Sequence, residues 1–238
     1  MFIKFEHDIY LFSTLGLSGG WIFKTKSGKV EHPTLLEYLK KESIDSYMST
    51  SLKHLNVEFK TSNGSLYFYD TLSFGTLKIV DNEKDLEKKL NSVGPDIMDD
   101  TTDFKVFHDA ICKPKNLKKV IGLVLMDQKT LSGIGNYLRA DILWLSKISP
   151  FRTIQKLSEL ELKKIFHNAK VLTWGQYDKK YAIRKKILLS KDKLPSDYDR
   201  DFFVYYEDED IYGNKVTKEE LFEGSQKRFI YWVKNLQL

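Results

Sequence analysis

A glycine-rich turn ahead of a helically spaced segment is the first place in this 238-residue sequence where backbone and side chain together could bind an anion. Gly133 and Gly135 bracket Ile134, and Asn136 opens the segment that follows. Glycines let the backbone turn twice and present its N–H groups outward, while a helix start adds unpaired N–H groups and partial positive charge. We expect a phosphate-binding loop in which Asn136 caps the helix and donates to a phosphate oxygen. By itself, however, Gly-x-Gly-Asn is more often an ordinary tight connection between two helices.

The basic residues gather in two stretches, which favours a polyanionic partner. The net charge of +5 is modest, but lysines cluster between 113 and 119, and lysines with an arginine cluster between 179 and 193. Acidic residues gather elsewhere, at 96–103 and 207–210. Charge separated in this way suits contacts with phosphates. A solvated lysine-rich surface explains each cluster equally well.

The cysteine and histidine content argues against a metal centre. Cys112 is the only cysteine, which excludes an internal disulfide and a thiolate zinc cluster. The five histidines are scattered without ligand spacing. The sequence has no apolar run of 18 residues, and its start, Met1-Phe2-Ile3, is not that of a signal peptide. We therefore expect a soluble intracellular protein, in the nucleus or the cytoplasm, with no metal and no cofactor.

Apolar spacing gives the chain a strand-rich beginning. Strand patterns occupy most of the first 80 residues and include a hairpin at 57–69, while 35–41 has the spacing of a short helix or an insertion. A helix predicted at 82–90 ends before Gly94-Pro95. We place a domain boundary there.

Helical spacing dominates the middle of the chain, from about 102 to 190. Helices are predicted at 117–129 and 137–146, and a third follows Ser158, which forms a capping box with Glu161. The last 40 residues return to strand patterns. Strands are predicted at 202–206 and 228–233, with a turn at 212–215 between them. This order of elements predicts an α+β fold.

Residues 125–150 read LMDQKTLSGIGNYLRADILWLSKISP and resemble the helix–two-turn–helix of the Fpg/Nei family of base-excision DNA glycosylases. Three further segments fall in the family's order: the loops at Leu15–Gly19 and Asp70–Gly75, and the stretch at Lys227–Trp232, which is similar to the family's finger hairpin. The resemblance covers essentially the whole chain. It overturns the interpretation of the glycine turn as an ordinary helix connection.

The resemblance implies three parts: an incomplete N-terminal β-sandwich at 1–95, a helical domain with the helix–two-turn–helix at 102–195, and a C-terminal β-hairpin finger at 200–238. DNA would lie in a basic cleft between the domains. Family members often hold the finger with four cysteines around zinc, but 200–238 contains no cysteine. The finger therefore resembles the zincless finger of the Nei-like branch, held by strand pairing and by the packing of Phe203, Tyr205, Ile230 and Trp232.

The resemblance also assigns phosphate contacts. Asn136 and Arg228 would bind the phosphates beside a nucleotide that is flipped out of the duplex. Gly133 and Gly135 would shape the loop that carries Asn136. These four residues are the predicted DNA-binding site of the helical domain and the finger.

Two apolar residues would act as wedges in the same complex. Leu17 and Phe74 would fill the gap that the flipped nucleotide leaves, and their loop settings favour exposure over core burial. Leu72 and Ser73 stand where the family has two arginines, the first of which hydrogen-bonds the base opposite the lesion. Leu72 cannot do this, so we expect weak discrimination of the opposite base.

The family's nucleophile is the amine of an amino-terminal proline, followed by a glutamate that handles protons and a lysine on a later hairpin. An α-amine, with a pKa of about 7.7–8.0, is neutral at pH 7 far more often than a lysine, with a pKa of about 10.4. This chain begins Met1-Phe2-Ile3, so no catalytic residue is assigned and we expect the chain as given to be inactive. Either the start is placed too far downstream, which we favour because a β-sandwich needs the missing strands, or the chain is a genuine truncation.

The expected function is base-excision repair by a DNA glycosylase that removes oxidised bases, with AP lyase activity in the complete protein. Its partner would be double-stranded DNA carrying an oxidised base or an abasic site, bound by a monomer away from any membrane. Two alternatives stay open: a catalytically inactive damaged-DNA-binding protein of the same fold, and an RNA- or ribosome-associated helix–two-turn–helix protein. The matches outside 125–150 argue against the second.

Overall fold

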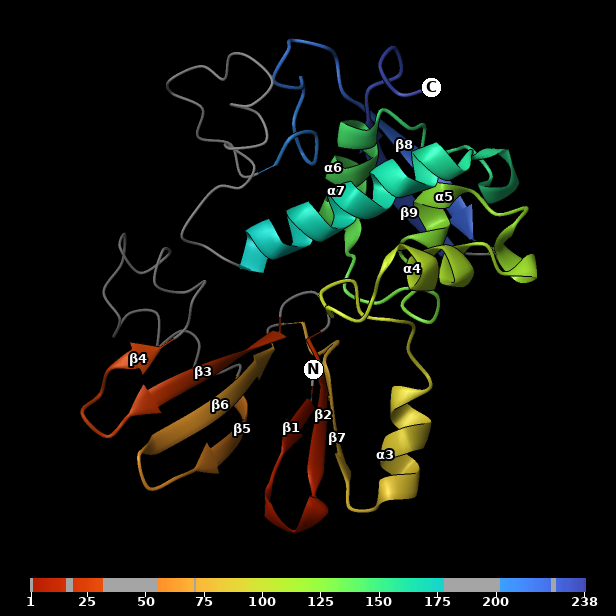
Figure 1. Cartoon of the computed structure of the whole chain (residues 1–238). Coiled ribbons are helices and arrows are strands. Elements are labelled where there is room, and N and C mark those ends of the chain that lie inside the picture. The colour runs from red at the N-terminus through yellow and green to blue at the C-terminus, as the bar shows by residue number, and fades with distance from the viewer. Residues whose placement is uncertain (1, 16–18, 32–54, 71, 178–201, 224–225) are drawn as a thin grey trace. The chain divides into compact units, whose positions relative to one another are not determined.

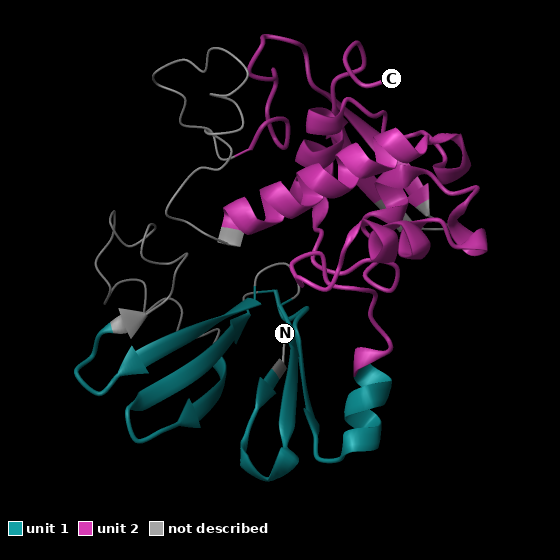
Figure 2. Ribbon diagram, viewed as in Figure 1, with its two compact units in different colours: residues 1–89 teal, residues 90–238 magenta. Residues whose placement is uncertain are grey.

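The computed structural model describes residues 2–15, 19–31, 55–70, 72–177, 202–223 and 226–238 (Figure 1). The chain forms two compact units, residues 1–89 and 90–238, called unit 1 and unit 2 below (Figure 2). The helix predicted at 35–41 and the basic stretch at 179–193 lie outside the described residues. Within the described ranges, no helix is long and apolar enough to cross a bilayer.

Unit 1 is built from two antiparallel sheets. One sheet has the strand order β1–β2–β7 and the other β4–β3–β6–β5. The strands are β1 (Phe2–Lys4), β2 (Tyr10–Thr14), β3 (Gly19–Thr25), β4 (Val30–Glu31), β5 (Leu55–Lys60), β6 (Gly64–Asp70) and β7 (Thr76–Val80). The predicted hairpin is β5–β6, and the helix predicted at 82–90 is α3 (Glu83–Leu90).

The core of unit 1 is small. The buried apolar side chains that the structure describes there are Tyr10, Leu11, Ile22, Phe68 and Val80. Other apolar side chains of unit 1 face solvent, among them those of Ile9 and Ile79.

Unit 2 combines helices with a two-stranded hairpin. The helices are α4 (Phe104–Ile111), α5 (Ile121–Val124), α6 (Asn136–Ser146) and α7 (Glu159–Tyr177), with 3-10 turns at Pro114–Asn116 and Ile154–Lys156. The hairpin pairs β8 (Thr217–Glu223) with β9 (Gln226–Trp232), and α6 packs against both α7 and β9. One apolar cluster runs through these elements, from Ile97 to Val233. The fold is a mixed helix-and-sheet fold, as predicted.

The capping box before α7 is confirmed. The backbone N–H of Ser158 donates to Glu161 Oε2 (2.8 Å), and the backbone N–H of Glu161 donates to Ser158 Oγ (3.3 Å). Each side chain therefore satisfies an amide that the helix start leaves without a partner.

The helix predicted at 117–129 is wrong in extent, since only α5 is α-helical there. The first amides of α5, those of Ile121 and Gly122, donate to the carbonyls of Arg152 and Pro150 on another segment. After the helix, the Asp127 carboxylate accepts from the Lys129 N–H (3.0 Å) and from the Thr130 hydroxyl (2.7 Å). These bonds draw the chain into a turn instead of a longer helix.

The strand predicted at 202–206 is also wrong. The backbone N–H groups of Phe203 and Val204 each donate to Asp141 Oδ1 on α6, at 3.1 Å. Because a buried side chain takes these amides, they are not available for a strand ladder. The segment instead bends across α6 and continues into a turn.

Candidate nucleic-acid interface

The glycine turn before α6 is held from the inside by one side chain. Gln128 accepts a hydrogen bond from the Gly133 N–H through Oε1 (3.1 Å) and donates to the Ile134 carbonyl through Nε2 (2.8 Å). Gly133 has φ 97°, and a Cβ there would lie 2.9 Å from Ile97 Cγ2. Only glycine fits this position. The Gly133 amide therefore faces Gln128 and not outward as the sequence suggested.

Gly135 leaves the start of α6 open. It is the N-cap of the helix and contributes no side-chain cap, and a Cβ built on it would meet nothing within 4 Å. The first N–H groups of a helix have no carbonyl partner within the helix and carry partial positive charge. A phosphate can therefore approach the backbone at this end of α6 without meeting a side chain at 135.

Asn136 is not the cap that the sequence predicted. It is the first helical residue of α6, and its Oδ1 accepts a hydrogen bond from Arg139 Nη2, one turn along the helix. Asn136 also makes a side-chain hydrogen bond with Tyr205, whose pKa is raised by burial in spite of this bond. Hydrogen bonds with Arg139 and Tyr205 thus hold the Asn136 side-chain amide at the N-terminus of α6.

Arg139 is buried completely beneath this site and links three segments. Its Nη1 donates to the Gly122 carbonyl (2.8 Å) on α5, and its Nη2 donates to the Phe229 carbonyl (2.7 Å) on β9 as well as to Asn136. Burial, and then the nearby charge of Arg228, lower the pKa of Arg139 to about 10. The side chain therefore remains a cation at neutral pH.

Arg228 is exposed on β9, opposite Leu221 of β8. The carbonyl oxygen of the next residue, Phe229, and Oδ1 of Asn136 both accept a hydrogen bond from the same nitrogen, Nη2 of Arg139. The structure therefore brings two of the predicted phosphate-binding residues, Asn136 and Arg228, to neighbouring positions on α6 and β9. The packing predicted for the hairpin is also present, with Phe203 and Ile230 buried and with Tyr205 and Trp232 half-buried.

The predicted wedge residues belong to unit 1. Leu17 lies outside the described residues, whereas 63% of Phe74 is exposed. Phe74 sits in a loop held by the buried Asp70, whose carboxylate accepts from the backbone N–H groups of Leu72 (3.2 Å) and Gly75 (2.5 Å). The Asp70 carboxylate therefore fixes the backbone of the loop, while the side chains of Leu72 and Phe74 are exposed to solvent.

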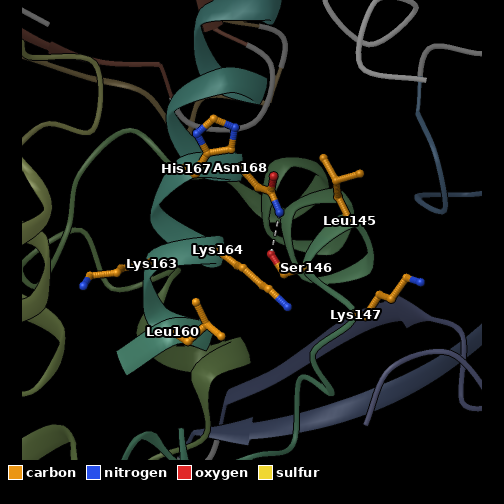
Figure 3. A pocket seen from close by; sticks show the side chains of 8 residues that line it. All are labelled: Leu145, Ser146, Lys147, Leu160, Lys163, Lys164, His167 and Asn168. Carbon is orange, nitrogen blue, oxygen red and sulfur yellow. Dashed lines mark hydrogen bonds between the residues drawn. The ribbon is translucent and has the colours of Figure 1, made fainter. Parts of the chain in front are cut away.

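A pocket of about 500 Å³ lies at the other end of α6 (Figure 3). Its lining includes Lys147 and Lys164, and Asn168 donates to Ser146 Oγ (2.9 Å) at its floor. An eleven-residue helix is about 15 Å long, so the pocket is well separated from Asn136. Within the described part of the chain, no three His, Cys, Asp or Glu side chains form a group that could hold a metal ion.

The sequence assigns no role at this site to Arg139 or Gln128, and it predicts Tyr205 only as a residue that packs in the hairpin. One feature of the sequence indicates that Arg139 has a specific role: Arg139 and Asp141 are the only charged residues of α6. A charged residue on a helix that is otherwise apolar on most sides is buried only with specific partners. Nothing in the sequence identifies those partners.

Residues 93–183 match the family model of the formamidopyrimidine-DNA glycosylase H2TH domain. A formamidopyrimidine-DNA glycosylase of Oceanobacillus iheyensis is 33% identical over 141 residues, which is 57% of this chain and 49% of the relative. One of Streptococcus agalactiae is 36% identical over 129 residues, which is 52% of this chain and 45% of the relative. The chain thus spans about half the length of the curated relatives it matches.

Two solved structures share the fold. The Lactococcus lactis formamidopyrimidine-DNA glycosylase bound to DNA with an AP site superposes with a TM-score of 0.68 at 18% identity, covering 99% of this chain and 76% of the other. MutM in complex with DNA containing carbocyclic 8-oxo-G gives a TM-score of 0.67 at 21% identity, covering 100% and 77%.

The sheet unit, the glycine turn before α6 and the terminal hairpin give this chain a fold similar to that of the solved glycosylase structures. The matched segment, the curated relatives and the shared fold all make this chain similar to the Fpg/Nei family.

Proposed function

We propose that this chain binds damaged double-stranded DNA as part of a base-excision repair glycosylase that removes oxidised bases. The observation that carries the proposal is the Arg139 guanidinium, which bonds both Asn136 and the backbone beside Arg228. It holds an open helix start and an exposed arginine side by side. The names of the relatives support the reaction class, and the titles of the structural neighbours support the ligand.

The geometry suits two adjacent phosphates. The first N–H groups of α6 and the Asn136 amide provide donors for one phosphate oxygen, and the Arg228 guanidinium provides a bidentate donor for the next. The buried charge of Arg139 adds a positive potential that water screens poorly. Because burial leaves the pKa of Arg139 at about 10, this charge persists through the physiological range.

Unit 1 would supply the wedge. The Phe74 side chain is exposed on a loop that Asp70 holds at its base, and Leu17 is proposed to join it. An apolar side chain inserted into a duplex replaces the stacking lost when a nucleotide flips out. The proposal assigns no catalytic residue to this chain.

The test is fluorescence anisotropy with a 20-base-pair duplex that carries one tetrahydrofuran abasic site. R228A and N136A should each weaken binding at least tenfold, and R228A should lower the slope of log affinity against log salt by about 0.9. The matched control is K88A, which removes an exposed lysine from α3 in unit 1. Equal affinities for R228A, N136A and wild type would overturn the proposal.

Borohydride trapping then separates an enzyme from a protein that only binds. A covalent adduct with an abasic-site duplex would assign lyase activity to this chain. Tight binding without an adduct would favour the catalytically inactive damaged-DNA-binding protein. Neither result tests the phosphate site itself, which is tested by the anisotropy measurement.

A further inference from the structure

Tyr206 occupies a backbone position that normally belongs to glycine. Val204–Glu207 is a four-residue turn, closed by a hydrogen bond from the Glu207 N–H to the Val204 carbonyl (3.3 Å). Tyr206 is its third residue and has φ 61°. A positive φ at the third position is supplied by glycine or asparagine in a type II turn, and it is a genuine outlier for a bulky side chain. Strained residues of this kind cluster at binding sites.

The neighbouring contacts explain the backbone conformation at residue 206, but they do not explain why that residue is a tyrosine. Asp141 fixes the amide of Phe203, just before the turn, and that of Val204, its first residue, whatever residue stands at 206. The Tyr206 side chain is 72% exposed. Glycine would meet the backbone requirement without strain, so the ring itself is the feature that tyrosine adds.

The exposed ring stands next to the phosphate site. It lies perpendicular to Tyr205, with centroids 4.7 Å apart, and Tyr205 is the hydrogen-bond partner of Asn136. On its other side it leans on Tyr231 of β9, at 5.1 Å. Two neighbouring rings therefore fix the direction of Tyr206 while most of its surface faces solvent.

Two cations lie on the hairpin side of the aromatic rings, and the acidic run 207–210 follows Tyr206 along the chain. The Lys218 ammonium lies 4.6 Å from the centre of the Phe229 ring and 5.7 Å from that of Tyr231, and Arg228 precedes Phe229 on the strand. Aromatic faces set among cations are the pattern with which proteins bind unstacked bases, since the rings stack on bases and the cations hold the phosphates.

We propose that Tyr206 is a stacking platform for an unstacked base of the DNA bound at the Asn136–Arg228 site. The proposal rests on the function proposed above and adds a specificity-determining residue to it. A fully paired duplex keeps its bases inside the helix, so the ring would favour DNA with an unpaired nucleotide. The preference would be independent of the chemistry of the base, because every base has a π-face.

The test compares a paired duplex with one that carries a single unpaired 2-aminopurine, a fluorescent base whose emission falls when it stacks. Y206G is the decisive variant, because it removes the ring and relieves the positive φ at the same time. We expect about tenfold weaker binding to the unpaired-base duplex, within the range that base stacking contributes. Binding to the paired duplex should change less than about twofold, and 2-aminopurine emission should fall less than with wild type.

Y206F and Y212A are the controls. Y206F keeps the stacking face and should bind as wild type does, while Y212A removes another exposed tyrosine of unit 2 and should have no effect. The melting temperature of Y206G should stay within about 4 °C of wild type, which excludes unfolding as the cause.

The outcomes separate this proposal from the one before it. If R228A weakens binding to both duplexes but Y206G weakens neither, the phosphate site stands and the stacking platform is wrong. If R228A changes nothing, the phosphate site itself is wrong. An equal loss for Y206G on both duplexes would also overturn the stacking role, because it would show a contact that does not depend on an unstacked base.

Discussion

The two units of this protein differ in how much apolar surface they bury. In unit 2, one apolar cluster connects the helices with the terminal hairpin. In unit 1, the described core consists of a few side chains, and Ile79 on β7 and Ile9 just before β2 face solvent. Apolar burial is the main favourable term in folding, so unit 2 should be the more stable of the two.

The difference extends to the way each unit positions its exposed functional side chains. Unit 2 buries whole charged groups, Arg139 and Asp141, and uses them to fix segments distant in sequence. Unit 1 fixes its exposed loop through Asp70, which accepts from the backbone N–H groups of Leu72 and Gly75, two and five residues further along the chain. A buried charge is costly to desolvate.

Removing Arg139 should have the largest effect. R139A would leave the Gly122 and Phe229 carbonyls without their donor and open a cavity in the core, so we expect unfolding free energy to fall by about 3–5 kcal/mol. Urea denaturation measures the loss. The DNA affinity of the folded fraction should fall as well, because the support of Asn136 is gone.

R152A serves as the control for R139A. Arg152 also bonds a carbonyl and a carboxylate, but it is part-exposed, so water can replace its bonds and the loss should be about 1 kcal/mol. A similar loss for the two variants would show that burial is not what makes Arg139 important. Faster amide exchange in β2 or β6 of R139A would show that the loss is not confined to unit 2.

A matched pair of core truncations tests the difference in packing directly. Leu143 and Leu11 are both buried, the first in unit 2 and the second in unit 1. We expect L143A to cost about 3–4 kcal/mol and L11A about 1–2 kcal/mol, since a sparse core collapses more readily around a cavity. Hydrogen exchange of amides within each unit gives the two values separately. Equal losses would mean that unit 1 is packed as rigidly as unit 2.

The parts of the fold that the sequence predicts correctly are those set by neighbouring residues. The apolar spacing after Asn136 predicts α6, and Ser158 with Glu161 predicts the start of α7, because both patterns act within one or two helical turns. The same spacing fails at 117–129 and 202–206. There, carbonyls near Pro150 and the Asp141 carboxylate take the backbone amides, and both lie far along the chain.

The candidate site also combines features set by neighbouring residues with features set by residues far along the chain. The glycine turn and Asn136 are visible in the sequence, and the resemblance adds Arg228. The link between them is not visible, because Arg139 finds one partner 17 residues before it and another 90 residues after it. The role of Asn136 also changes with that link, from a helix cap to an amide held by the buried guanidinium.

A surface ion pair of unit 2 should have a smaller effect that depends on pH. A hydrogen-bonded ion pair with Arg152 (2.5 Å) lowers the pKa of Glu161 to about 2, against about 4.3 in an unfolded chain. A lowered pKa adds stability above the unfolded value, and this stability is lost as pH falls from about 5 to 2. E161Q should therefore cost about 1 kcal/mol at pH 7, since the pair is part-exposed, and nothing near pH 2. Urea denaturation at several pH values checks this, and a constant difference would show that the ion pair is not the source.

Truncation of Phe74 should have the smallest effect, and it separates binding from stability. Because its side chain is 63% exposed, F74A should change the unfolding free energy by less than about 0.5 kcal/mol. If the ring is a wedge, F74A should weaken binding to an abasic-site duplex by about threefold to tenfold and leave binding to an intact duplex unchanged, since only the first offers a gap to fill. V93A, which truncates another exposed apolar side chain outside the loop, should alter neither affinity. An affinity loss for both duplexes would turn Phe74 into a general contact, and no loss at all would leave the phosphate site of unit 2 as the sole carrier of DNA binding among the described residues.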